Sequence, residues 1–249
     1  MTEDERPYLT TPRLAGISWL VHGFGDAGWS EADFLAFAAS KGFRPVIMRQ
    51  VHSDTVHRLE EIPAGKLEGD ALMTNIPGLL LVIRTADCLP VFLVDLRKRV
   101  VAAVHCGWRG TEKRIIEKSV RALGRAYGSK PGEMLAALGP CIGPSCYEVG
   151  PEVREGFLRA GFPPSVFSHY QEGGPVRRGA DSDKHLGQAG KSLLDLRAAN
   201  VWLLGGMGFK KENILDSGSG CTHCEPSFLS YRRDPGERRR MYNFIGSKG

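Results

Sequence analysis

The stretch Val91-Phe-Leu-Val-Asp-Leu-Arg-Lys-Arg-Val-Val-Ala-Ala-Val104 decides the fold. Two apolar runs rich in β-branched residues flank a short polar segment, which is typical of an antiparallel β-hairpin. A turn centred between Leu96 and Arg97 predicts that Cys88 faces His105 across the hairpin. Directly opposed residues have Cβ atoms about 4.5–5.5 Å apart, so both side chains would reach one metal ion.

Further strands and helices alternate around this hairpin. Short apolar runs at 46–48 and 79–83 predict two more strands. Apolar residues at helical spacing, with a capping box at Ser30 and Asp33, a cap at Thr111 and stops at Gly42 and Gly128, predict four helices. These helices lie at about 30–42, 111–128, 151–160 and 188–204. Short strands mixed with helices indicate an α+β fold with a mixed β-sheet.

The composition is that of an ordinary globular protein. The chain has 249 residues, of which 42% are hydrophobic and 24% charged, with a net charge of +5. No internal repeat or linker is visible, and the Gly- and Pro-containing stretch 171–190 is too short to divide domains, so residues 1–249 are expected to form a single domain. Five late arginines form a basic cluster: Arg232, Arg233, Arg238, Arg239 and Arg240. No nucleic-acid module accompanies them, so we expect a solvated or anion-facing surface and no nucleic-acid partner.

The ends of the chain and its apolar runs bear on location. The first residues are polar and acidic, and the longest apolar runs are far too short to span a bilayer. We therefore expect a cytoplasmic protein with no membrane partner, and a monomer or weak homo-oligomer. In that compartment the six cysteines are expected to be thiols or ligands rather than disulfides.

Cys88 and His105 both lie where predicted strands give way to loops, a common location for working side chains. Thiolate and imidazole are ligands that zinc prefers, and three protein ligands leave a fourth position open for chemistry. The third ligand is expected in Gln50-Val-His-Ser-Asp-Thr-Val-His57, which offers His52 and His57. Spacing does not choose between these two histidines.

Carboxylates and arginines near these segments suggest reaction partners. Zinc lowers the pKa of bound water to about 7, and a nearby carboxylate could move protons to and from that water. Asp70 and Asp87 are the nearest carboxylates, and either could instead orient a ligand histidine. Guanidinium groups pair well with phosphate. Four arginines are candidates for an anion site: Arg49, Arg109, Arg232 and Arg233.

Several of these segments together resemble the purine nucleoside phosphorylase family formerly described as laccase-domain or polyphenol oxidase proteins. The matching stretches are Gln50-Val-His52, Gly69-Asp-Ala-Leu-Met-Thr74, Thr85-Ala-Asp-Cys-Leu-Pro90, Val104-His-Cys-Gly-Trp-Arg-Gly110, Leu138-Gly-Pro-Cys-Ile-Gly143 and Phe228-Leu-Ser-Tyr-Arg-Arg-Asp234. The resemblance implies zinc ligation by His52, Cys88 and His105, and therefore selects His52 over His57. It also implies a mixed β-sheet sandwich flanked by helices.

The activity that the resemblance implies is phosphorolysis of adenosine, inosine, guanosine and methylthioadenosine, together with adenosine deamination. On this basis we expect catalytic roles for Asp87 and Cys88 and substrate binding by Arg49 and Arg232. The chain departs from the family pattern after His22-Gly-Phe24, where an arginine and hydroxyls are missing. A thiol, Cys106, also replaces the usual alanine after the second ligand histidine.

Three other interpretations use the same residues. Cys88 with His105 as base would suit a cysteine hydrolase or deamidase. A copper polyphenol oxidase fits less well, because a multicopper site needs many histidines and the chain has seven, although copper could bind in vitro. A closed site with four ligands would instead make the metal a structural staple of a binding module. For the separate motif Cys221-Thr-His-Cys224, we expect a structural role without metal.

Overall fold

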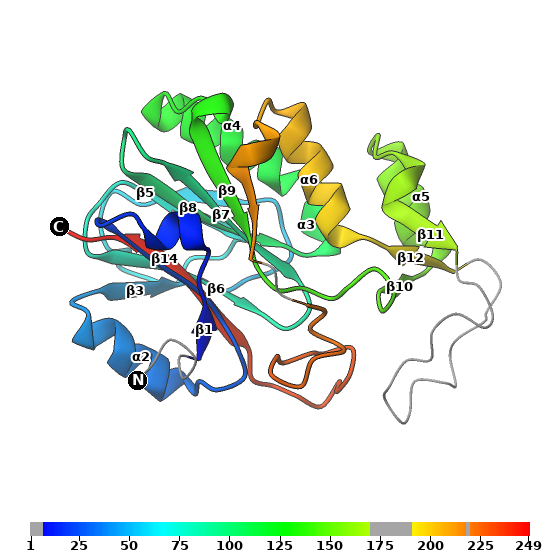
Figure 1. Cartoon of the computed structure of the whole chain (residues 1–249), viewed down its shortest axis with the longest axis horizontal. Helices are drawn as coiled ribbons and strands as arrows, with labels where there is room; N and C mark the ends of the chain where they lie inside the picture. The colour runs from blue at the N-terminus through cyan, green and yellow to red at the C-terminus, as the bar shows by residue number, and fades with distance from the viewer. Residues whose placement is uncertain (1–6, 170–190, 218–219) are drawn as a thin grey trace.

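The computed structural model describes residues 7–169, 191–217 and 220–249, so the stretch 171–190 lies outside the described residues. Two mixed β-sheets pack face to face, with helices on both outer sides (Figure 1). The five-stranded sheet has the order β1-β2-β14-β6-β3, and the six-stranded sheet has the order β13-β9-β7-β8-β5-β4. The α+β class and the sandwich of mixed sheets are therefore confirmed.

The bounds of the strands follow the two sheets. The five-stranded sheet contains β1 (Tyr8–Leu9), β2 (Leu20–Gly25), β3 (Arg44–Ile47), β6 (Leu79–Thr85) and β14 (Met241–Ser247). The six-stranded sheet contains β4 (Val56–Arg58), β5 (Ala71–Thr74), β7 (Leu89–Asp95), β8 (Val100–Cys106), β9 (Met134–Leu138) and β13 (Ile214–Asp216). A third, small sheet contains β10 (Glu148–Val149), β12 (Ser192–Leu194) and β11 (Phe167–His169).

Helices cover the outer faces of both large sheets. The α-helices are α1 (Pro12–Ala15), α2 (Glu31–Ser40), α3 (Trp108–Glu112), α4 (Ile115–Tyr127), α5 (Pro151–Arg159) and α6 (Leu196–Gly206). Short 3₁₀ turns are formed by Pro131–Glu133, Pro164–Val166 and Lys211–Asn213. Among the described residues, no helix has the length and apolar character needed to cross a membrane.

The alternation of side chains in β6 shows how the layers are built. Leu79, Leu81 and Ile83 point between the two large sheets, whereas Leu80 and Val82 point outward and pack against α2. This is the period of two that a strand imposes on its side chains. All residues of β7 and β8 are buried, because α4 and α6 cover the other face of their sheet. These two strands therefore form a rigid support for whatever projects from their ends.

The hairpin forms as predicted, but the predicted register is wrong by two residues. Pro90, and not Cys88, lies opposite His105. The Oδ1 atom of Asp95 accepts the N–H groups two and three residues further on, at 3.1 Å each, and Arg99 takes a left-handed φ of 50°. These contacts build a four-residue turn in place of the two-residue turn assumed. A shift of two keeps every side chain on its face, so Cys88 remains on the same side as His105.

The first and third helices agree with their sequence patterns. Ser30 accepts the N–H of Asp33 through its hydroxyl, and the Asp33 carboxylate accepts the N–H of Ser30, each at 3.2 Å. This is the predicted capping box, and Gly42 follows α2 with φ of 73°. Helix α5 matches the prediction at 151–160 to within one residue.

Two helix predictions need correction. Thr111 lies inside α3 rather than capping α4, because Arg114 breaks the helix with a left-handed φ of 63° and α4 begins after it. The predicted helix at 188–204 begins only after residue 195, where Asp195 caps α6 by accepting the N–H of Ala198 at 2.8 Å. Ser192–Leu194 forms β12 instead, and 188–190 lie outside the described residues.

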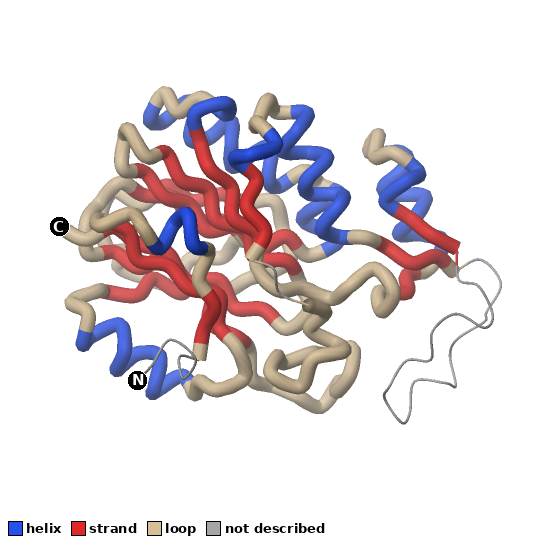
Figure 2. The backbone as a smooth tube through the Cα atoms, viewed as in Figure 1, coloured by secondary structure: helices blue, strands red, loops and turns tan. Residues whose placement is uncertain are grey.

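The late part of the chain returns to the centre of the molecule. A long segment without helices or strands, residues 220–240, runs along the lower edge of the sheets (Figure 2). It leads into β14, which lies between β2 and β6 and is antiparallel to both. This path brings residues of the segment beside the end of β7, more than a hundred residues earlier in the sequence.

Candidate metal centre and cavity

Two imidazoles and one thiol converge at one end of the six-stranded sheet. Ring nitrogens of His52 and His105 and the sulfur of Cys88 all lie within 4.8 Å of one another. His52 belongs to the loop between β3 and β4, Cys88 immediately precedes β7, and His105 lies near the end of β8. His57 is not in this group, because it lies in β4 with its Nε2 atom 2.8 Å from the carbonyl oxygen of Glu68.

Gly107 forms one wall of the space between these donors. A Cβ atom at this position would lie 3.0 Å from Nδ1 of His52 and 3.1 Å from Sγ of Cys88. The backbone thus approaches the donors as closely as a glycine permits. A thiolate with two imidazoles is also a donor set that zinc prefers. The residues present therefore fit a zinc ion.

Asp70 organises two of the three donors from beneath. Its fully buried carboxylate places Oδ1 at 2.8 Å from Nδ1 of His105. The same carboxylate accepts the N–H of His52 at 3.1 Å and the N–H and hydroxyl of Ser53 at 2.6 and 2.7 Å. These bonds hold the loop at His52, whose φ is 55°, in a left-handed conformation that non-glycine residues rarely adopt. The carboxylate orients one histidine ring and the backbone of the other.

The pKa values within this group are strongly coupled. Burial alone would lower the pKa of His105, but the Cys88 thiolate and the Asp70 carboxylate raise it to about 9. Burial would also raise the pKa of Asp70, but hydrogen bonds from His105 and Ser53 lower it to about 2. For His52, desolvation of the ring and the nearby His105 lower the pKa. Without metal, His105 is therefore protonated at neutral pH, and a metal must displace that proton.

Asp87 connects the centre to the late segment of the chain. Its Oδ1 atom accepts the hydroxyl of Thr222 and its Oδ2 atom accepts the N–H of Arg232, both at 2.7 Å. Its own backbone has a φ of 91°, and its carbonyl oxygen accepts the N–H of Ile142 at 2.9 Å. Asp87 thus fixes two distant segments beside Cys88. Its own backbone is strained, which is common at functional sites.

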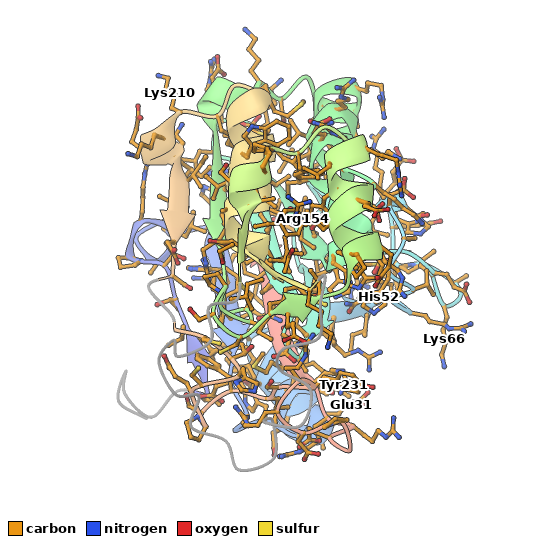
Figure 3. The ribbon with its side chains drawn as sticks, turned by 90° about the vertical axis from the view of Figure 1, so that its right-hand side faces the viewer. Glu31, His52, Lys66, Arg154, Lys210 and Tyr231 are labelled. Carbon is orange, nitrogen blue, oxygen red and sulfur yellow. The ribbon has the colours of Figure 1, made fainter. Side chains whose placement is uncertain are left out.

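The three donors open into a cavity of about 630 Å³. Six arginines line it: Arg49, Arg84, Arg109, Arg232, Arg238 and Arg240. Among the described residues of its lining, Asp87 is the sole carboxylate. Figure 3 labels His52 and Tyr231, which both line this cavity, on one flank of the molecule. Such an excess of guanidinium groups favours an anionic ligand, because these groups bind phosphate or carboxylate through paired hydrogen bonds.

Three of the four arginines proposed from the sequence line the cavity. Arg49 is largely exposed and pairs with Glu68 at 2.5 Å. Arg232 donates to the carbonyl oxygen of Glu148 at 2.9 Å. Arg109 lies over the Trp108 ring at 4.3 Å.

Arg233 does not line the cavity. Its guanidinium donates to backbone carbonyl oxygens of the late segment, among them those of Thr222 at 2.7 Å and Phe228 at 2.5 Å. These acceptors use the donors that a phosphate would need. Arg233 therefore holds the segment together rather than facing a ligand.

Sequence reasoning missed several residues of the lining. Arg84 directly precedes the Thr85-Ala-Asp-Cys motif, and the amide of Gln50 bonds the backbone N–H and carbonyl of Arg84 at 2.7 and 2.8 Å. Tyr147 lies under the Arg232 guanidinium, 5.4 Å away, and burial together with Cys88 raises the pKa of its hydroxyl. Gln50 and Arg84 adjoin motifs singled out in the sequence, whereas no local signal marks Tyr147.

A comparison with known protein families identifies the family of the chain. Residues 31–248 match the family model described as multi-copper polyphenol oxidoreductase laccase. The chain belongs to this laccase family. The resemblance seen in the sequence motifs is therefore confirmed, and the match includes the three converging donors and the arginines of the cavity.

Relatives of this laccase-family chain carry names from nucleoside metabolism. Purine nucleoside phosphorylase YfiH of Shigella flexneri is 37% identical over 203 residues, which cover 81% of this chain and 73% of the relative. A purine nucleoside phosphorylase of Deinococcus radiodurans is 37% identical over 212 residues, covering 85% and 72%. Adenosine deaminase RL5, from an unknown prokaryotic organism, is 37% identical over 198 residues, covering 76% and 69%.

Solved structures agree with the fold over nearly the whole length. The hypothetical protein YfiH of Bacillus licheniformis superposes with a TM-score of 0.83 at 26% identity, covering 98% of both chains. YlmD of Geobacillus stearothermophilus gives a TM-score of 0.80 at 28% identity, covering 98% of this chain and 97% of its own. This laccase-family chain thus shares its architecture with both.

Proposed function

We propose that this chain is a zinc-dependent purine nucleoside enzyme, which carries out phosphorolysis of adenosine, inosine, guanosine and methylthioadenosine and deaminates adenosine. The observation that supports this most is that His52, Cys88 and His105 open into the same cavity as six arginines. The names of the relatives, purine nucleoside phosphorylase and adenosine deaminase, support the same pair of reactions.

In this proposal His52, Cys88 and His105 hold the zinc ion. A zinc ion with three protein ligands supplies a Lewis acid and lowers the pKa of bound water to about 7. Asp70 keeps Nδ1 of His105 engaged, so that Nε2 is the ring nitrogen available to the metal.

Phosphorolysis assigns the arginines to phosphate. A phosphate oxygen forms a bond to C1′ of the sugar while the bond from C1′ to the purine nitrogen breaks, and the purine leaves with the electron pair and gains a proton. Arg49 and Arg232 are proposed to hold the phosphate, since both line the cavity. Tyr147, whose raised pKa keeps its hydroxyl protonated, can donate a hydrogen bond to the departing purine.

Deamination assigns the proton transfers to Asp87. Water adds to C6 of adenine and the amino group leaves as ammonia, so a proton must pass from the water to the leaving nitrogen. A positioned carboxylate serves this purpose in zinc deaminases. Asp87 is the proposed group because it lines the cavity next to Cys88 and is held rigidly by Thr222 and Arg232.

A cysteine hydrolase or deamidase is the second candidate. The observation in its favour is the contact between Cys88 and His105, which acts with Asp70 against the effect of burial and raises the pKa of the imidazole to about 9. A thiolate beside an imidazolium is the arrangement that nucleophilic cysteines use. A nucleophile of this kind would keep its activity in a chelator, whereas a zinc enzyme would lose it. Copper accepts the same donors, so metal analysis must include copper.

The deciding experiment measures bound metal and the turnover of adenosine and inosine, each with and without phosphate. Wild type, Cys88→Ala and the control Cys106→Ala would be compared, since Cys106 is buried and outside the donor group. We expect activity in wild type and the control, and the loss of one zinc with the activity in Cys88→Ala. Full activity of Cys88→Ala would refute the zinc-enzyme proposal, and turnover of adenosine alone, independent of phosphate, would leave only the deaminase.

A further inference from the structure

A second group of metal-binding side chains lies apart from the first. The sulfur atoms of Cys146 and Cys224 and a ring nitrogen of His223 all lie within 4.8 Å of one another. Cys146 belongs to the segment that follows β9, whereas His223 and Cys224 belong to the late segment that precedes β14. Two stretches of chain almost eighty residues apart thus bring two sulfur atoms and one imidazole nitrogen together.

One backbone bridge and one hydrogen bond from a backbone N–H to a thiol join these stretches. Cys141 and Cys221 form a parallel bridge, in which the N–H of Thr222 donates to the carbonyl oxygen of Cys141 at 3.1 Å. The N–H of Gly143 donates to Sγ of Cys221 at 3.0 Å. Cys221 also contacts the thiol of Cys146. A small cavity of about 350 Å³ borders the cysteines of both stretches.

The separation of the two sulfur atoms fits a shared metal better than a disulfide. Sγ of Cys146 lies 3.3 Å from Sγ of Cys224. A disulfide requires about 2.05 Å. Two thiolates bound to one tetrahedral zinc ion at about 2.3 Å each lie about 3.8 Å apart. The turn Cys221-Thr-His-Cys224 also presents two cysteines at the spacing that zinc sites use.

We propose that Cys146, His223 and Cys224 bind a second zinc ion and that Cys221 is its fourth ligand. Three sulfurs and one nitrogen complete a tetrahedral set, and closed sites of this kind are structural. This replaces the metal-free role expected for Cys221-Thr-His-Cys224, for which the sequence offered only Cys141 and Cys146 as further zinc ligands. The proposal does not depend on the nucleoside activity, because none of the four residues is among the three donors of the first centre.

The position of this site gives it a task. Cys146 directly precedes Tyr147. Thr222 lies between Cys221 and His223, and its hydroxyl donates to Asp87. Tyr147 and Asp87 both line the large cavity. A zinc ion here would therefore tie together two walls of the cavity and reinforce the backbone bridge between Cys141 and Cys221.

Zinc content in single variants tests the proposal directly. The purified full chain would be equilibrated with zinc, passed through a desalting column and analysed for metal per chain. We expect two zinc ions in wild type and in Cys106→Ala, one in Cys224→Ser, one in Cys88→Ala and none in the double variant. Cys224 is exposed, so its replacement by serine should leave the rest of the fold intact.

Two further measurements separate the sites. Cobalt bound through thiolates gives strong near-ultraviolet absorption, and this absorption should persist in Cys88→Ala but fall in Cys224→Ser. The midpoint of thermal unfolding should be lower in Cys224→Ser than in wild type. A chelator should lower the midpoint of Cys224→Ser only by the amount that the loss of the first metal causes.

Three outcomes would overturn the proposal. They are a single zinc ion in wild type that Cys224→Ser keeps and Cys88→Ala loses, an unchanged zinc content in Cys224→Ser, and a mass 2 Da below that of the reduced chain with a peptide linking Cys146 to Cys224. Failure of the first centre has a different signature, because Cys88→Ala would then retain all of its metal.

Discussion

Nδ1 of His105 lies 2.8 Å from Oδ1 of Asp70, and the same carboxylate accepts the backbone N–H of His52. One buried anion therefore sets both the ring of one proposed ligand and the loop of another. The carboxylate has no exposed surface, so water does not weaken these bonds. The geometry of the proposed metal centre depends on this single side chain more than on any other neighbour of the donors.

Replacing Asp70 should loosen the metal without removing a ligand. In Asp70→Asn the side-chain NH₂ group would face the N–H donors that the carboxylate now accepts. We expect metal affinity to fall roughly 10- to 100-fold, as is usual when the partner of a ligand histidine is lost. Competition with a chromophoric chelator measures this. Asp54→Asn is the control, because Asp54 lies in the same loop and pairs with Lys118, and an equal loss there would contradict the prediction.

Filling the space beside the donors should also weaken metal binding. In Gly107→Ala the new methyl group would crowd His52 and Cys88 at 3.0 and 3.1 Å. The φ of −73° at Gly107 suits alanine, so the backbone itself would not be strained. We expect roughly tenfold weaker metal binding. In Gly205→Ala no atom lies within 4 Å of the added methyl, and this variant should bind metal like wild type.

Removing an arginine from the cavity should weaken phosphate more than nucleoside. In Arg232→Ala the guanidinium that lies over Tyr147 is lost. A hydrogen bond to a charged group contributes about 1.5–3 kcal/mol, so the KM for phosphate should rise at least tenfold. The KM for inosine should change much less. Arg44→Ala removes an exposed arginine outside the cavity, and equal effects of the two variants would argue against a phosphate site at Arg232.

His22 should make the stability of the protein depend on pH. Burial lowers its pKa from 6.5 to about 4, and its Nε2 atom accepts the N–H of Thr11 at 2.9 Å. Between these pH values His22 binds a proton in the unfolded chain but not in the folded chain, so stability falls as the pH is lowered from 6.5 toward 4. The loss amounts to about 3 kcal/mol over that window.

Urea unfolding of wild type and His22→Gln at pH 7 and pH 4.5 measures this contribution. The difference between the two proteins cancels the titration of all other groups. Wild type should lose about 2–3 kcal/mol more than the variant on acidification. Parallel loss in both proteins would show that His22 does not titrate as its environment indicates.

Local patterns predicted the hairpin and the side of the sheet that carries Cys88 and His105. They did not predict the register, because Asp95 and Arg99 shape the turn through bonds that strand propensity does not reveal. The error of two residues left the faces unchanged, since side chains alternate with a period of two. The convergence of Cys88 and His105 was therefore accessible from local patterns although the pairing was wrong, whereas His52 was chosen over His57 by the family resemblance alone.

The parts that could not be predicted depend on contacts between distant segments. Ser192–Leu194 reads as the start of a helix, yet it pairs with β10 and β11. The structural role of Arg233 could not be predicted for a similar reason, because its carbonyl partners come from a segment with no regular structure. Tyr147 lies in the cavity beside Arg232, which comes from the late segment. The spacing of residues along the chain does not predict such contacts between distant segments.

The central position of β14 in its sheet has a consequence for folding during synthesis. Residues 241–247 follow every other described strand, yet they fill the gap between β2 and β6. A ribosome that has not yet released these residues holds a chain whose sheet has a missing strand and whose arginines at 232–240 have no fixed path. Such long-range pairing is slow to form. Chains that lack residues 241–247 should therefore bind ligand poorly, and ligand binding would report on whether β14 has joined the sheet.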